Sequence, residues 1–107
     1  MPRNKLANRR ESMTFDLWHN ANRYHISYFA DATGIKELFA HGAKVGSDAD
    51  SALATVTAII SIALQYGVPY DVLEHAALKL EDGNSAELYG AILEAIRLRS
   101  EEHTSEL

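Results

Sequence analysis

The sequence predicts an α+β domain, a three-stranded antiparallel meander followed by three helices (β-β-β-α-α-α) packed on one sheet face. Between residues 13 and 40, apolar and polar residues alternate in three short runs that turn residues separate. Beyond Gly42, apolar residues instead recur at intervals of three and four, the spacing of amphipathic helices. The 107 residues, of which 47% are hydrophobic and 23% charged, allow one domain of ordinary globular composition.

The three predicted strands span residues 13–18, 23–30 and 35–40. Residues 20–22 form the first turn and residues 31–34 the second, which ends in a glycine placed where a positive φ is expected. Short turns of this kind join antiparallel neighbours, and one face of the resulting sheet must be covered by other elements. In the first predicted strand one face is formed by Met13, Phe15 and Leu17. In the second, one face is formed by Tyr24, Ile26 and Tyr28.

The main helix is expected over residues 48–66. Ser47 is placed to cap it, and the acidic Asp48 and Asp50 in its first turn suit the helix dipole. Its predicted apolar stripe is Leu53, Val56, Ile60, Ala63 and Leu64, widened by Ile59, Ile62 and Tyr66. A stripe of that width predicts a helix that is buried on more than one side.

Two further helices follow in the sequence. Gly67 is expected to end the main helix as a C′ residue, and Pro69 suits the start of a second helix over about residues 69–80. After a turn, Ser85 is placed to cap a third helix. The apolar stripe of that third helix is predicted to be Leu88, Ile92, Leu93 and Ile96.

Charge divides the chain into three parts. Residues 1–10 form a basic arm that contains Arg3, Lys5, Arg9 and Arg10. Residues 11–98, the predicted domain, hold five basic and twelve acidic residues, a net charge of −7. Residues 99–107 resemble the translated reading frame of a sequencing-library adapter, so we expect a non-native and poorly ordered tail.

The chain contains no cysteine. This excludes disulfides, thiolate metal ligands, cysteine nucleophiles and thiyl-radical chemistry by this chain alone. The longest apolar run, around residues 58–64, is too short to cross a bilayer, and the basic N-terminus leads into no signal-peptide core. We therefore expect a soluble cytoplasmic protein without a membrane partner.

The histidines and serines of the chain are candidates for a chemical role. The histidines ahead of the tail are His19, His25, His41 and His75. Their spacing matches no zinc motif, and simple hairpin register places His19 near Arg23 rather than opposite His25. No serine lies in a G-x-S-x-G turn, and Ser61 is expected to be a small residue within the main helix. These patterns predict structural or surface histidines, no metal site, no cofactor and no catalytic residue.

Lys44, Gly46 and Ser47, just ahead of the main helix, form the candidate nucleotide- or phosphate-binding site. Free backbone N–H groups at a helix N-terminus attract anions, Lys44 adds a positive charge, and Gly46 permits close approach to the backbone. Asp48 and Asp50 reduce that attraction, and the P-loop spacing G-x-x-x-x-G-K-[ST] is absent. A helix cap after a sharp turn explains the same residues, so both interpretations stay open.

The basic arm suggests a second function. Arg3, Lys5, Arg9 and Arg10 could contact the phosphates of a nucleic acid, with Trp18 or Tyr24 nearby for stacking. The acidic body argues against nucleic acid as a partner, and a solvated terminus is the favoured explanation of the arm.

A longer pattern resembles the TSCPD domain of ribonucleotide reductases. The family has a glycine before a strand, Glu-x-Phe within it and a Lys-x-Gly-Ser loop after it. The corresponding residues here are Gly34, Glu37, Phe39, Lys44, Gly46 and Ser47. Further resemblance lies in Ile60–Leu64, Gly67–Val68, Glu81–Gly83 and Gly90–Leu93, and the likeness covers roughly residues 6–96.

The resemblance implies a small stand-alone relative of the C-terminal domain of cobalamin-dependent reductases. The namesake Thr-Ser-Cys-Pro-Asp segment is absent, and the cysteines of reductase chemistry are missing. Likeness of fold does not transfer activity, so we expect a non-catalytic module. It would bind a nucleotide or phosphate, or dock on a reductase or another protein. Self-association is also expected, because a three-stranded sheet leaves edges to cover.

Overall fold

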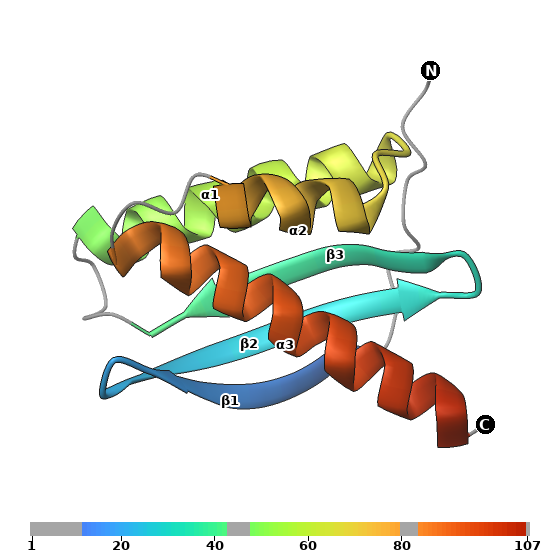
Figure 1. The fold of residues 1–107 in the computed structure, drawn as a ribbon, viewed down its shortest axis with the longest axis horizontal. Helices are drawn as coiled ribbons and strands as arrows, with labels where there is room; N and C mark the ends of the chain where they lie inside the picture. Colours follow the sequence, from blue (N-terminus) through green and yellow to red (C-terminus); the bar gives the residue numbers. More distant parts are fainter. Residues whose placement is uncertain (1–11, 43–47, 80–83, 107) are drawn as a thin grey trace. The chain divides into compact units, whose positions relative to one another are not determined.

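The computed structural model describes residues 12–42, 48–79 and 84–106, and the elements follow the predicted order (Figure 1). They are β1 (Met13–His19), β2 (Asn22–Asp31), β3 (Gly34–His41), α1 (Asp48–Gln65), α2 (Tyr70–Lys79) and α3 (Asn84–Glu106). The predicted α+β class and the order of three strands and three helices are confirmed. The chain forms two compact units, Met1–Val68 with the sheet and α1, and Pro69–Leu107 with α2 and α3. Packing of α2 and α3 on the sheet stays a prediction.

The sheet is an antiparallel meander with the strand order β1-β2-β3. A two-residue turn joins β1 to β2, with φ values of 50° at Asn20 and 65° at Ala21. Two consecutive positive φ angles are typical of the type I′ hairpin turn, whose twist matches that of the flanking strands. The predicted turn was one residue too long, so the register differs by one and His19 lies opposite Asn22.

The second turn is fastened by the side chain of Asp31. Its Oδ1 accepts hydrogen bonds from the N–H of Thr33 at 2.8 Å and from the Thr33 hydroxyl at 2.6 Å. These bonds hold the pKa of Asp31 below its usual value. Gly34 follows with a φ of 125°, which confirms the predicted positive φ.

An irregularity in the β2–β3 ladder shifts the strand register. Ala30 pairs with Ile35, but Phe29 pairs with Glu37, so Lys36 is the extra residue of a bulge. Beyond the bulge every β3 residue moves by one position relative to β2. His41 therefore lies opposite His25 instead of one position away.

One face of the sheet is buried, and we call it the inner face. Its most buried side chains are Tyr24, Ile26 and Tyr28 of β2 and Leu38 and Ala40 of β3. Phe15 of β1 packs edge-on against Tyr28, with the ring centroids 6.3 Å apart. The shared apolar faces predicted for the first two strands are thus the two halves of one core face.

Helix α1 lies along the outer edge of β3, and polar side chains make the junction. The Ser61 Oγ accepts a hydrogen bond from the Leu38 N–H at 2.9 Å and lies 3.0 Å from the Leu38 carbonyl oxygen. One turn later the Gln65 Nε2 donates to the Lys36 carbonyl at 3.3 Å. Thr57 continues this buried stripe one turn earlier. The helix thereby satisfies backbone groups that an edge strand would otherwise leave unpaired.

This junction corrects two predictions about α1. Ser61 is a hydrogen-bonding group at the sheet edge rather than merely a small residue. The apolar residues Ile59, Ile62 and Tyr66 are exposed, so α1 is not buried on the side that they form. The reason is rotational, because the helix turns its Thr57–Ser61–Gln65 stripe to the strand edge and so moves the widened stripe toward solvent.

The end of α1 has the predicted form. Gly67 has a φ of 99°, its N–H donates to the Leu64 carbonyl at 3.0 Å, and the Val68 N–H donates to the Ala63 carbonyl at 3.1 Å. This pair of bonds is the Schellman motif with Gly67 at C′. The predicted cap Ser47 lies outside the described residues. The other predicted cap, Ser85, lies inside α3, because this helix begins one residue earlier, at Asn84.

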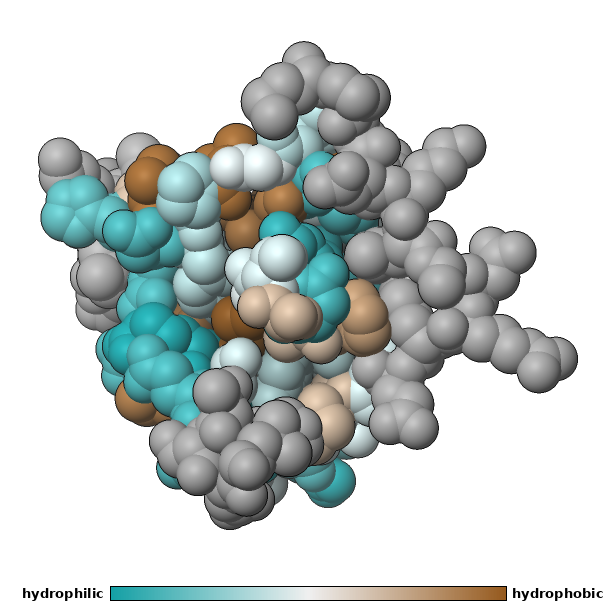
Figure 2. All heavy atoms as spheres, turned by 90° about the vertical axis from the view of Figure 1, so that its right-hand side faces the viewer, coloured by the Kyte–Doolittle hydropathy of each residue, from teal (hydrophilic) through white to brown (hydrophobic). Residues whose placement is uncertain are grey.

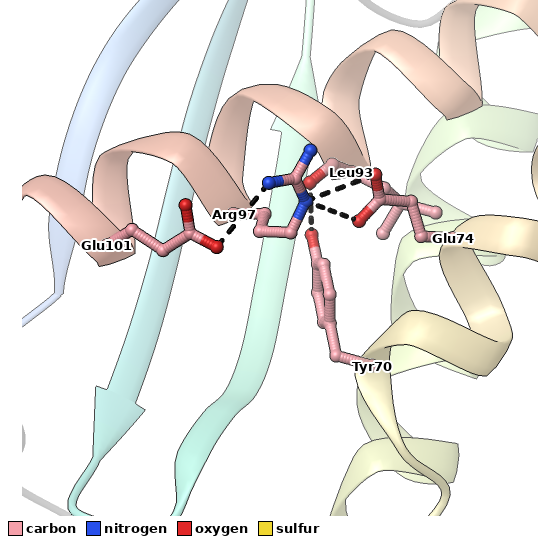
Figure 3. A network of polar contacts seen from close by, with 5 residues as sticks. All are labelled: Tyr70, Glu74, Leu93, Arg97 and Glu101. Atoms are coloured by element: carbon pink, nitrogen blue, oxygen red, sulfur yellow. Dashed lines mark hydrogen bonds and ion pairs between the residues drawn. The ribbon is translucent and has the colours of Figure 1, made fainter.

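In the second unit, α2 and α3 are joined by a network of polar contacts (Figure 3). The Tyr70 hydroxyl donates to the Leu93 carbonyl at 2.6 Å, and burial raises the pKa of Tyr70. The Arg97 Nε donates to both Glu74 carboxylate oxygens, at 3.0 and 3.3 Å. Arg97 also reaches Glu101 one turn later at 3.4 Å, which supports the helix at an i,i+4 spacing.

Helix α3 extends into the predicted tail. It runs to Glu106, so residues 99–106 are helical, whereas the expectation of poor order in the tail stays a prediction. The Arg97–Glu101 pair links the predicted domain to the tail across one turn of this helix. The resemblance of residues 99–107 to an adapter sequence is a separate matter and stays a prediction.

Candidate functional site

The other face of the sheet, which we call the outer face, carries polar and aromatic side chains. Because side chains alternate along a strand, the residues between the core positions all point to this face. They are Thr14, Asp16 and Trp18 of β1, Arg23, His25, Ser27 and Phe29 of β2, and Glu37, Phe39 and His41 of β3. An open depression of about 490 Å³ lies here, and its lining includes Asp16, His25, Ser27 and His41.

Asp16 organises the centre of the outer face. Its Oδ2 accepts hydrogen bonds from the Arg23 Nε at 2.9 Å and the Arg23 Nη2 at 2.6 Å. Its Oδ1 lies 2.7 Å from the Nδ1 of His25, which stands directly opposite in the ladder. The bond from His25 and then that from Arg23 hold the pKa of Asp16 below its usual value.

This arrangement fixes the chemistry that His25 can offer. An ionised carboxylate only accepts hydrogen bonds, so the Nδ1 of His25 must be the donor. The Nε2 of His25 is then the ring nitrogen left to meet a ligand, as acceptor when the ring is neutral and as donor when it is charged. The Arg23 guanidinium, in contrast, already donates hydrogen bonds to Asp16 from two of its nitrogens.

His41 completes a row that crosses all three strands. Asp16, His25 and His41 are consecutive partners in the ladder. His41 stacks on Phe39 from the same strand, with ring centroids 6.0 Å apart and an interplanar angle of 15°. Within the described ranges, no three acidic or histidine side chains come together closely enough to hold a metal ion.

The other predicted histidines lie elsewhere. His75 is exposed on α2. His19 is half-buried on the inner face of β1, and its Nε2 is buried without a hydrogen-bond partner among the residues that the structure describes. The prediction that His19 does not face His25 is confirmed by the register.

The site residues that the sequence predicted cannot be located. Lys44, Gly46 and Ser47 lie outside the described residues, as do Arg3, Lys5, Arg9 and Arg10 of the basic arm. The acidic first turn of the helix that follows Ser47 is present, with Asp48 and Asp50. Sequence reasoning missed the Asp16–Arg23–His25 cluster. A two-residue turn at Asn20-Ala21 was the available signal, because it places Asp16 opposite His25.

Comparison with known families identifies the chain. A model of the TSCPD domain matches residues 2–97, nearly the whole sequence. This chain belongs to the TSCPD domain family. The TSCPD match spans both compact units. No curated protein matches the chain, and no solved structure does.

The first part of the pattern that resembles the TSCPD domain lies on β3. Gly34 opens the strand, and Glu37 and Phe39 project from it on the outer face. The Lys-x-Gly-Ser part of the motif follows His41 in the sequence. Among the helices of the described ranges, none is both long and apolar enough to cross a membrane.

Proposed function

We propose that this TSCPD protein is a non-catalytic module related to ribonucleoside-diphosphate reductase, and that it binds a nucleotide or another phosphate compound. The observation that carries the proposal is the depression on the outer face of the sheet, where Asp16, His25 and His41 form a polar row beside an exposed aromatic ring. Ligand sites in proteins are usually concave and combine apolar walls with a few placed polar groups.

The aromatic part of this surface suits a nucleobase. Phe39 is 39% exposed and stacked with His41, so the two rings offer a flat surface to a third ring. Stacking of a base on an aromatic side chain contributes about 1–3 kcal/mol and tolerates any base. His25, whose Nε2 supplies a hydrogen-bonding group, lines the depression together with His41.

The phosphate would be held by the segment that follows β3. Lys44, Gly46 and Ser47 follow His41 by three, five and six residues, so base stacking and phosphate contact can serve one molecule. Arg23 is less suited to this role, because Asp16 already neutralises its guanidinium.

Binding without catalysis is favoured by the surroundings of His25. Asp16 orients the ring as in a nucleophile–base pair, but catalysis by nucleophilic attack also needs a hydroxyl bonded to the base. In the part of the chain that the structure describes, no serine or threonine hydroxyl is hydrogen-bonded to His25. The cysteines of reductase chemistry are absent from the sequence.

Calorimetric titration tests the proposal. Nucleoside diphosphates and inorganic phosphate are titrated into the protein and into two variants, Lys44→Ala and Phe39→Leu. Lys44→Ala should weaken both ligands about tenfold or more, because a charge-assisted hydrogen bond is lost. Phe39→Leu should weaken the nucleotide alone. Lys36→Ala, which removes the lysine at the bulge of β3, is the control and should change neither.

Two results would contradict the proposal. One is the absence of binding by any nucleotide or by phosphate, which would leave docking on a reductase or another protein as the function. The other is nucleotide binding that both Lys44→Ala and Phe39→Leu leave unchanged, which would place the ligand elsewhere.

One observation favours nucleic-acid association as a second candidate. Of the two aromatic residues predicted to assist the basic arm, Tyr24 is 8% exposed and belongs to the core, whereas Trp18 is 67% exposed on the outer face. Trp18 can therefore stack on a base next to Arg23, its partner in the ladder. This candidate predicts salt-dependent binding of single-stranded DNA or RNA that is lost when residues 1–10 are deleted, and salt-independent or absent binding would exclude it.

A further inference from the structure

The exposed side of α1 carries an uncharged, mainly apolar stripe that no feature of the proposed ligand site explains. Its members Ala52, Thr55, Ile59, Ile62 and Tyr66 are all exposed. Ile59, Ile62 and Tyr66 are 61%, 43% and 47% exposed, which is unusual for large apolar side chains that follow one another on a single helix. Figure 2 shows one face of the molecule, on which both hydrophobic and hydrophilic described atoms are exposed.

The spacing of this stripe is that of a helix-pairing seam. The intervals from Ala52 to Tyr66 are three, four, three and four residues, the pattern by which two helices pack along each other. Tyr66 lies just past the end of α1 but keeps helical bonding, since its N–H donates to the Ile62 carbonyl at 3.0 Å. The stripe therefore continues to the last turn of the helix.

The stripe also lacks the charges that normally keep an exposed helix face in water. No charged residue occurs between Asp50 and Asp71. Depletion of charge is the compositional mark of the core of a protein interface. It also means that two copies of this helix can approach each other without repulsion between like charges.

We propose that this stripe pairs with the same stripe of a second copy of the chain, with the two α1 helices antiparallel. The side chains grade along the helix from small, at Ala52 and Thr55, to large, at Ile62 and Tyr66. Antiparallel pairing sets the large end of one stripe against the small end of the other, which keeps the distance between the helices even. Parallel pairing would set Tyr66 against Tyr66 and force the helices apart at one end. The stripe is thus complementary to itself about a two-fold axis near the turn formed by Ile59 and Ile62.

The available area sets the strength of the pairing. The five side chains can bury roughly 400 Å² per copy, about half of the ~800 Å² per partner that a stable specific interface commonly buries. The dimer should therefore dissociate on dilution. A permanent partner protein would be expected to meet a larger or more charged surface.

Sedimentation velocity over a wide range of protein concentration tests the pairing first. The protein should shift from monomer to dimer as the concentration rises. Ile59→Glu should abolish the shift by placing a charge in the seam, whereas Val72→Glu, which changes an apolar residue of α2 that is 53% exposed, should leave it intact. A protein that stays monomeric at every concentration, or a dimer that survives Ile59→Glu, would overturn the proposal. Unfolding of Ile59→Glu would do so as well, because it would show that the chain's own residues cover the stripe.

Cross-linking tests the direction of the pairing. Because the chain has no cysteine, a single introduced cysteine reports one position without background. Thr55→Cys and Tyr66→Cys should form a disulfide when the two variants are mixed and oxidised, but neither should cross-link with itself. Positions 55 and 66 lie about 16.5 Å apart along a helix, beyond the reach of a disulfide. Self-linking of either variant without mixed linking would contradict the antiparallel arrangement.

Discussion

Replacement of Ser61 by alanine tests how α1 is attached to the sheet. The Ser61 hydroxyl is the hydrogen-bond acceptor for the backbone N–H of Leu38, and both residues are buried. Alanine fits the space but leaves that N–H without an acceptor, which costs about 1–3 kcal/mol when water cannot replace the lost partner. Alanine also favours the helix by about 0.5 kcal/mol relative to serine. The free energy of unfolding should therefore fall by about 0.5–2.5 kcal/mol.

The assay is urea denaturation followed by circular dichroism, together with hydrogen exchange at the Leu38 amide. Ser51→Ala is the matched control, because it makes the same chemical change on an exposed side of α1 and should be neutral or slightly stabilising. Ser61→Ala should also speed exchange of the Leu38 amide, whereas Ser51→Ala should not. Equal stability of the two variants, with the Leu38 amide equally protected in both, would refute the account of the α1–β3 junction.

Two further predictions concern the sheet. Gly42→Ala should lower the free energy of unfolding by about 1–3 kcal/mol. The added Cβ would lie 2.7 Å from both the Arg23 carbonyl oxygen and the Tyr24 Cα, and backbone atoms cannot move aside easily. A variant that unfolds at the same urea concentration as the wild type would contradict this prediction. Since the folded-state pKa of Asp16 is depressed, its contribution to stability is present above its unfolded pKa and is lost as the pH falls below about 4 through the folded value. Asp16→Asn should therefore weaken the loss of stability as the pH falls below about 4. An unchanged acid-denaturation profile would show that the cluster with Arg23 and His25 does not form in solution.

Much of the fold could be read from local patterns. Alternation of apolar residues marks the strands, and Gly34 and Gly67 mark the ends of a turn and a helix, because their positive φ angles are a local property of the chain. The limits of α1 and α2 follow from the same kind of signal, and the structure places them within one residue of the predicted ends. Such features need no knowledge of what the segment packs against.

The candidate site was less predictable, because it depends on register. Asp16 meets His25 only because the first turn has two residues, and His25 meets His41 only because Lys36 is bulged out of the second ladder. A difference of one residue in either connection would turn one of these side chains to the other face of the sheet. The residues involved are ordinary polar residues of a strand, so no motif announces them.

The sequence by itself determined that the chain is an α+β member of the TSCPD family without the cysteines of reductase chemistry, because residue types and their order carry that information directly. Only the tertiary structure decided which side of α1 meets the sheet. Periodicity favoured an apolar contact, but the edge of β3 needed hydrogen-bond partners, and Ser61 and Gln65 supply them. Satisfying buried backbone groups took precedence over burying Ile59 and Ile62, and this choice left the apolar stripe of α1 exposed.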